Sequence, residues 1–138
     1  MPSKRPKNRK KTLQKKAENL WKDVVKARDK VCQGRRVRGC TDETLQVHHV
    51  LGRASKRSFL EIINGVLLCR GCHFFLHQND AFRMEIEDMV RKRNGFDRLK
   101  NEVRQGGAFL EWGRISWLED KIKVLEFLKK GFEEGIYK

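Results

Sequence analysis

Every cysteine and every histidine of this 138-residue chain falls between residues 32 and 77. These residues are Cys32, Cys40, Cys69, Cys72, His48, His49, His73 and His77. Thiolates and imidazoles are the side chains with which proteins hold zinc and other transition metals. The stretch therefore predicts that bound metal organises this part of the chain, as a scaffold, as a reaction centre, or as both.

The composition of the whole chain sets the frame for that prediction. A chain of 138 residues predicts one compact domain, and with 38% hydrophobic residues a bound metal would help to hold the fold. Lys and Arg outnumber Asp and Glu by 32 to 18, so the net charge is +14. Such an excess is typical of proteins that bind a polyanion, most often nucleic acid, although a solvated basic surface would look the same.

The N-terminus and the apolar runs indicate where such a protein works. The basic N-terminus has no apolar segment behind it, so we expect no signal peptide. No apolar run approaches the length that spans a bilayer. We therefore expect a cytoplasmic protein with no membrane partner (in the host cell, if a phage encodes it). In that reducing compartment, paired cysteines indicate metal ligands rather than disulfides.

The chain divides into three parts by charge and periodicity. Residues 1–11 are basic and contain two prolines and no acid, which predicts a disordered arm. Lys10 and Lys11 of this arm would contact phosphate, or would only aid solubility. Residues 12–79 begin with an amphipathic helix and contain the cysteines and histidines. Residues 80–138 predict a helical C-terminal extension.

Three short segments hold or adjoin most of the cysteines and histidines. Residues 45–50 (LQVHHV) alternate as a strand does, and 66–68 form a second apolar strand after an Asn-Gly turn. Residues 70–78 predict a helix. This helix would place His73 and His77 one turn apart on the same face.

The four cysteines predict a structural zinc site, because four thiolates complete a tetrahedral sphere and leave no open position. Two residues separate Cys69 from Cys72, as in a zinc knuckle, whereas seven residues separate Cys32 from Cys40. The longer spacing departs from the usual two to four. In an alternative site, His73 joins Cys69 and Cys72. The same Cys-x-x-Cys-His run also matches the attachment motif of c-type haem, which requires an oxidising compartment.

The histidines predict a second, catalytic site. A hairpin folded against the helix would bring His48, His73 and His77 together. Three imidazoles with open positions are typical of a catalytic divalent metal. Successive side chains of a strand alternate, so His49 would face away from His48. A free imidazole beside the metal is suited to take a proton from water.

The segment LQVHHVLGR…NGVLLCRGCHFFLH, within residues 32–79, resembles the HNH endonuclease family. The resemblance implies a ββα-metal (His-Me finger) core, in which a hairpin, a loop and a helix surround one divalent cation. It implies a metal-dependent DNA endonuclease that hydrolyses phosphodiester bonds by a one-metal, His-general-base mechanism and leaves 5′-phosphate and 3′-hydroxyl ends. Cysteine knuckles are common in the bacterial and phage members of this family.

The resemblance also implies a role for each matching residue. His49 matches the general base, and His48 matches the metal ligand that precedes it. His73 and His77 match the helix ligands of the histidine-rich members. Asn64 matches the middle residue of the motif, and we expect it to hold the loop and orient the base rather than to bind metal. The catalytic cation would be Mg²⁺, Mn²⁺, Ni²⁺ or Zn²⁺, in addition to the structural Zn²⁺.

We therefore expect an α+β, helix-rich protein whose ββα-metal core is stapled by the zinc site and flanked by N-terminal and C-terminal helices. DNA is the expected partner, with Arg53, Lys56 and Arg57 in a loop over 52–63 where a phosphate backbone could lie. Cutting both strands would favour a homodimer or sequential nicking. A phage or mobile-element setting, with a homing or nicking role and a phage or host protein partner, fits by analogy. The alternative is a non-catalytic zinc-module DNA-binding protein, which needs the cysteines but not His49.

Overall fold

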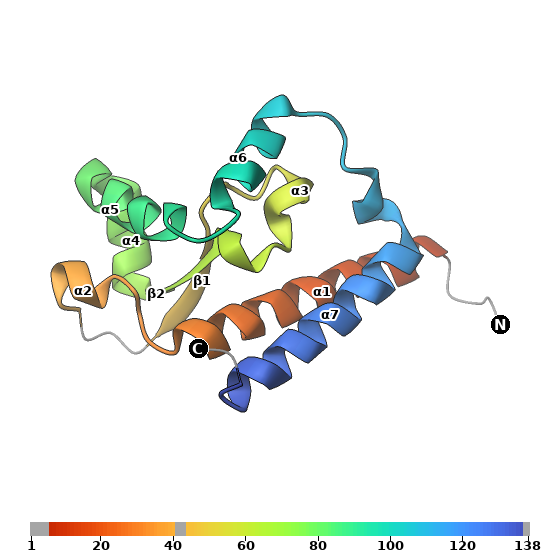
Figure 1. Ribbon diagram of the computed structural model, residues 1–138, viewed down its shortest axis with the longest axis horizontal. Helices are drawn as coiled ribbons and strands as arrows, with labels where there is room; N and C mark the ends of the chain where they lie inside the picture. Colours follow the sequence, from red (N-terminus) through yellow and green to blue (C-terminus); the bar gives the residue numbers. More distant parts are fainter. Residues whose placement is uncertain (1–5, 41–43, 137–138) are drawn as a thin grey trace.

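The structure, a computed structural model, describes residues 6–40 and 44–136. Its elements in order are α1 (Pro6–Asp29), α2 (Arg35–Arg38), β1 (Leu45–His49), α3 (Lys56–Phe59), η1 (Ile62–Asn64), β2 (Gly65–Cys69), α4 (Arg70–Gln78), α5 (Asp80–Arg91), α6 (Phe96–Gln105), η2 (Leu110–Gly113) and α7 (Ile115–Glu133). Helices dominate, and the two strands form one small antiparallel sheet (Figure 1). The expected helix-rich α+β class is confirmed.

Strands β1 and β2 form the hairpin on which the rest is placed. Leu45 pairs with Cys69, and His49 pairs with Gly65 at the other end. Every residue of β2 is buried, whereas β1 is mostly half-buried. Helix α4 begins at the residue after β2 and packs against both strands. The predicted strands and the predicted helix over 70–78 are therefore confirmed.

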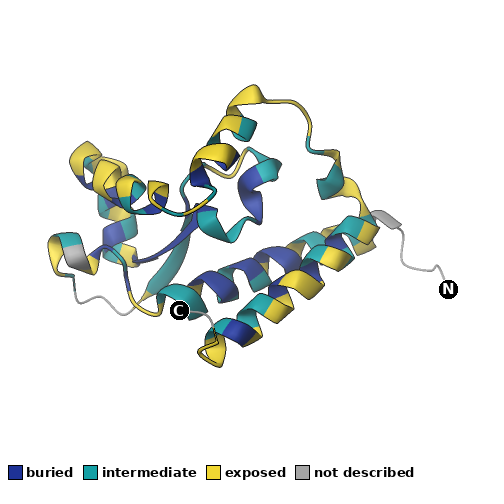
Figure 2. Cartoon of the chain, viewed as in Figure 1, coloured by how far each residue is buried: buried dark blue, intermediate teal, exposed yellow. Residues whose placement is uncertain are grey.

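Two apolar clusters enclose the hairpin, and β2 contributes to both because its side chains alternate between its two faces. Val66 and Leu68 belong to the cluster that α4 and α5 complete, together with Leu76. Leu67, which lies between them in the sequence, belongs to the cluster that α1 and α7 complete around Trp21. Figure 2 shows the buried strand between these helices and the exposed outer faces of α5 and α7. Burial on both faces explains the unbroken apolar run of β2.

Helices α1 and α7 lie side by side and run in the same direction (Figure 1). Arg9 pairs with Glu119 near the start of both helices, and Asp23 pairs with Lys129 nearer their ends. Apolar side chains of both helices meet in the cluster around Trp21. The first and last helices of the chain therefore build one core with the hairpin.

Two expectations about local structure are wrong. Helix α1 begins at Pro6, six residues earlier than expected, so residues 6–11 of the supposedly disordered arm are helical. Lys and Arg are good helix formers, and Arg9 is anchored by its ion pair with α7. Residues 1–5 of the arm lie outside the described residues. The loop expected over 52–63 contains α3 and most of η1, because buried contacts shape it into short turns.

Candidate metal centres

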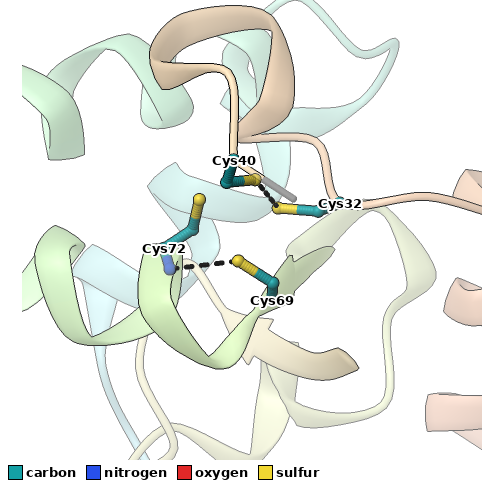
Figure 3. Close-up of side chains that lie close together, drawn as sticks. All are labelled: Cys32, Cys40, Cys69 and Cys72. Atoms are coloured by element: carbon teal, nitrogen blue, oxygen red, sulfur yellow. Dashed lines mark hydrogen bonds between the residues drawn. The ribbon is translucent and has the colours of Figure 1, made fainter. Parts of the chain in front are cut away.

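The four cysteine thiols come together from separate places in the chain (Figure 3). Cys32 follows α1, Cys40 follows α2, Cys69 ends β2, and Cys72 lies in the first turn of α4. Their sulfur atoms all lie within 4.8 Å of one another. The backbone N–H of Cys72 donates a hydrogen bond to Cys69 Sγ at 3.2 Å. Such spacing suits four thiolates around one ion, so the predicted grouping of the cysteines is confirmed.

The long loop between Cys32 and Cys40 closes because it contains the helical turn α2. That turn ends at Gly39, whose φ of 60° lies in the left-handed region that glycine adopts without strain. Gly34 packs so closely that a Cβ there would lie 2.7 Å from Cys72 Sγ. The seven-residue spacing is therefore a folded turn, which explains its departure from the usual knuckle.

A positive charge faces the thiols. Arg38 Nη1 donates to Cys72 Sγ at 3.3 Å, and the guanidinium lies 4.9 Å from the centroid of the Phe75 ring. The hydrogen bond to Cys72 raises the pKa of Arg38, while burial raises the pKa of the Cys72 thiol. A buried thiol with a raised pKa needs a bound cation to deprotonate at neutral pH. Arg38 would offset part of the negative charge that four thiolates leave around a divalent ion.

The imidazoles of His48, His73 and His77 form a second group, with ligand nitrogens within 4.8 Å of one another. His48 comes from β1 and the other two from α4, and their ring centroids are 5.1 to 5.8 Å apart. Burial, together with the neighbouring imidazoles, lowers the pKa of His48 to about 4. The neutral imidazole is the form that binds metal. The predicted group of three histidines therefore comes together in a form that could bind a metal ion. His73 belongs here and not with Cys69 and Cys72.

Gln46, which was not among the predicted site residues, orients one of these ligands. The Oε1 atom of Gln46 lies 2.6 Å from His73 Nδ1. Because a carbonyl oxygen accepts, Nδ1 carries the proton and Nε2 keeps its lone pair for a metal. Gln46 precedes His48 by two residues in β1 and therefore shares its face. The two-residue spacing from His48 is the sequence signal that could have identified Gln46 as part of this site.

His49 lies on the other face of β1, as its alternation with His48 predicted. Its ring is stacked between Trp21 and Phe59, with centroids 4.0 and 4.6 Å away and planes within 13° of parallel. His49 Nε2 lies 3.0 Å from the backbone oxygen of Phe59, so Nε2 is the protonated nitrogen and Nδ1 carries the lone pair. Burial lowers the pKa of His49 to about 4, despite that hydrogen bond. The side chain is therefore a neutral imidazole in a fixed orientation.

Asn64 holds the loop that positions this imidazole. Its side chain is fully buried, and Oδ1 accepts from the backbone N–H of Leu51 at 2.7 Å. Its Nδ2 donates to the backbone oxygen of Ser58 at 3.1 Å. The Asn64 side chain therefore links the two ends of the loop, Leu51 and Ser58. Ser58 directly precedes Phe59, whose carbonyl contacts His49. Both polar atoms of the Asn64 amide form hydrogen bonds with the backbone, as expected for a residue that holds the loop.

Two arginines that no sequence pattern predicted hold the turn that carries Asn64. Arg28 donates to the backbone oxygens of Ile62 and Gly65 at 2.6 Å each. Arg93 donates to the same Gly65 oxygen at 2.6 Å and to the oxygen of residue 63 at 3.0 Å. The carboxylate of Asp29 pairs with Arg28 and accepts from the N–H of residue 67 at 2.9 Å. The start of β2 is therefore fixed by partly buried charged side chains.

The basic residues expected to contact DNA do not all lie together. Arg53, Lys56 and Lys11 line one cavity between α1 and the loop. The guanidinium of Arg57 lies over the ring of Phe109 instead, 5.2 Å from its centroid. Lys10 extends beside η2 and does not line that cavity.

Comparisons with protein-family models, with curated proteins and with solved structures find no match for this chain. Among the described residues, no helix is both long enough and apolar enough to cross a membrane. The chemistry of the two ligand groups is therefore what bears on function.

Proposed function

We propose that this protein is a metal-dependent DNA endonuclease of the HNH class, with β1, β2 and α4 as its ββα-metal core. The observation that carries the proposal is the pair His48 and His49. The first belongs to a group of three imidazoles suited to a divalent ion, and the second is held as a neutral base on the opposite face of the strand. Hydrolysis of a phosphodiester bond requires both a stabilised phosphate and a positioned base.

The two ligand groups are suited to different ions. Four cysteines complete a tetrahedral sphere, so that site would hold a structural Zn²⁺. The three histidines leave positions for water and a phosphate oxygen, so that site would hold Mg²⁺, Mn²⁺, Ni²⁺ or Zn²⁺. A divalent ion bound there would stabilise the charge that develops on the phosphate and on the leaving 3′ oxygen.

His49 is the residue proposed to accept the proton of the attacking water. Donation from Nε2 to the Phe59 carbonyl leaves Nδ1 as the acceptor. As the water oxygen bonds to phosphorus, its proton passes to Nδ1 and the bond from phosphorus to the 3′ oxygen breaks. The leaving 3′ oxygen takes up a proton from solvent water, so the products are a 5′-phosphate and a 3′-hydroxyl. Stacking against Trp21 and Phe59 would keep the ring from rotating out of position.

Asn64, Arg28 and Arg93 act in this proposal as positioning residues. Asn64 joins the two ends of the loop whose Phe59 carbonyl binds His49. The two arginines hold the turn that carries Asn64 by bonding to its backbone oxygens. A base held by buried contacts loses little entropy when it reacts, and so contributes more to the rate.

A non-catalytic zinc-module DNA-binding protein is the competing function, and the net charge of +14 favours it equally. Such a protein would use the cysteines and the basic surface. It would have no need for three imidazoles within 4.8 Å, nor for a neutral histidine fixed on the opposite face of the same strand. The histidine group therefore favours the nuclease.

Cleavage of supercoiled plasmid, compared across Mg²⁺, Mn²⁺, Ni²⁺ and Zn²⁺ with mapping of the ends, tests the proposal. We expect nicked or linear products with 5′-phosphates. In His49→Gln, whose amide can still donate to the Phe59 carbonyl, we expect a rate lowered roughly 10²- to 10⁴-fold, because the general base is lost. DNA affinity, measured by fluorescence anisotropy, should change little.

Zinc content and thermal melting of His49→Gln provide the control for folding. Cleavage by a folded His49→Gln at the wild-type rate would contradict the assignment of His49. DNA binding without cleavage under every ion would contradict the nuclease and leave the binding protein.

A further inference from the structure

A cavity of about 270 Å³ lies where α1, the loop containing α3, and η2 meet. Lys11 and Lys15 of α1, Arg53 and Lys56 of the loop, and Trp112 of η2 line it. Four basic side chains and one acidic side chain give the lining a formal charge of +3. A concave site with this excess of positive charge attracts an anion.

Specific contacts between the three segments shape this cavity. Gln14 Nε2 donates to the backbone oxygen of Trp112 at 2.7 Å and so joins η2 to α1. Arg53 Nη2 lies 2.8 Å from Glu18 Oε2 and joins the loop to α1. Lys56 Nζ donates to the backbone oxygen of Arg53 at 3.3 Å. The cations are therefore brought together by the fold and are not scattered surface lysines.

The one carboxylate of the lining holds a cation in place. The side chain of Glu18 is 10% exposed, whereas that of its partner Arg53 is 61% exposed. Burial raises the pKa of Glu18, but the hydrogen bond and the charge of Arg53 outweigh it, so the net shift is downward and the carboxylate stays ionised. Among the described residues, Lys11, Lys15 and Lys56 form no ion pair with an acidic side chain. Their charges are available to a ligand.

The aromatic residues of the cavity connect it to His49. Lys56 Nζ lies 4.0 Å from the centroid of Phe59 and 5.1 Å from that of Trp112. Phe59 also stacks on His49 and accepts its hydrogen bond. An anion bound by Lys56 would therefore lie one side chain away from the proposed base. Trp112 adds an aromatic ring of the kind on which nucleic-acid bases stack.

We propose that this cavity binds a backbone phosphate of the nucleic-acid strand that is presented to His49. This assignment rests on the proposed nuclease function. Phe59 connects the cavity to His49, so the bound phosphate is taken to belong to the strand that His49 would cleave. Charge draws the phosphate into the site, and the contacts from Glu18 and Gln14 keep that site open. Lys15 and Trp112 join Lys11, Arg53 and Lys56 as residues that contact the strand.

Removing two of the lysines tests this assignment. The variant Lys15→Gln/Lys56→Gln is compared with Lys123→Gln/Lys130→Gln, which loses the same charge from exposed positions of α7. Binding of a labelled DNA duplex is measured by fluorescence anisotropy at several salt concentrations, with no divalent ion added. In the cavity variant we expect at least a tenfold loss of affinity and a shallower salt dependence, by about 0.9 in the logarithmic slope for each phosphate that is no longer neutralised. The α7 variant should bind within about twofold of the wild type.

Two competitors distinguish the sources of negative charge. Unlabelled duplex should compete better with the wild type than with the cavity variant, and polyglutamate should not distinguish the two proteins. If polyglutamate distinguishes them and DNA does not, the cavity binds an acidic protein segment. If inorganic phosphate alone binds in a lysine-dependent manner, without any effect on DNA affinity, the cavity is a free-phosphate site. Either result overturns the proposal.

Protection of lysines from acetylation, read by mass spectrometry, locates the contact. DNA should protect Lys11, Lys15 and Lys56 and leave Lys123 reactive. Equal losses of affinity in the two double variants would show that only total charge matters and would overturn the proposal. If the cavity variant alone is weakened but plasmid is never cut, the cavity stands and the nuclease does not. If plasmid is cut and both double variants bind DNA with the same affinity, the nuclease function stands and the cavity assignment does not.

Discussion

The cysteine group and the histidine group share one hairpin and one helix, yet their surroundings differ. Three of the four cysteines are buried, and the group joins the segments after α1 and α2 to the end of β2 and the start of α4. The histidine group uses only β1 and α4, and its member His77 is exposed. A buried group that crosses several segments is placed to hold a fold together. A group with an open side is placed to exchange ligands.

The two groups stay apart although Cys72 and His73 are neighbours in the chain. Successive side chains of a helix point about 100° apart around its axis. Two consecutive residues of α4 can therefore contact different parts of the structure. Cys72 faces Arg38 and the loop of α2, whereas His73 faces Gln46 of β1. A short helix beside a hairpin can therefore serve two sites of different chemistry.

Replacing one ligand in each group should have the largest effect. In Cys69→Ser we expect loss of bound zinc and of the cooperative unfolding transition, because the free energy of binding a structural metal is folding free energy. In His73→Ala we expect a folded protein that still holds one zinc. Metal analysis and thermal melting by circular dichroism measure both. A cooperatively folded Cys69→Ser that retains its zinc would show that the thiols do not hold the fold.

Crowding the turn on the histidine side should have the next largest effect. A Cβ at Gly65 would lie 2.7 Å from the Trp21 ring, which stacks on His49. We therefore expect Gly65→Ala to lower the free energy of unfolding by about 1–3 kcal/mol, measured by urea denaturation, with zinc content unchanged. Gly113→Ala is the control, since its Cβ would meet only Lys10 Nζ at 3.8 Å. A Cβ at Gly65 would also lie 2.6 Å from Val25 Cγ2, so equal stabilities of the two variants would mean that Trp21 and Val25 do not pack tightly on the start of β2.

Removing Gln46, the hydrogen-bond partner of His73, should have the smallest effect and should change only the histidine site. Without the acceptor on Gln46, His73 is no longer held in the tautomer that presents Nε2. We expect Gln46→Leu to weaken Co²⁺ binding at the histidines roughly 10- to 100-fold. The thiolate-to-Co²⁺ absorption band, which reports the cysteine site, should not change. Gln78→Leu, at an exposed position of α4, should leave both sites unaffected, and a similar loss there would remove the role assigned to Gln46.

Local geometry accounts for what could be predicted about the two sites. The helix over 70–78 and the alternation of His48 with His49 depend only on the repeat of the backbone, and both are confirmed. The expected arm failed at residues 6–11, because an ion pair with a distant helix stabilises turns that composition alone suggests are disordered. The stack of His49 on Trp21 and Phe59 has no local pattern at all.

Residue type and spacing were enough to separate four thiols from three imidazoles and to set His49 apart from His48. Those features depend on neighbours in the chain, where the backbone repeat dictates direction. The packing of distant elements decided the rest: the clamp of Arg28 and Arg93 on the turn before β2, and the cavity between α1 and η2. Such contacts join residues far apart in the sequence, so they exist only once the helices have closed around the hairpin.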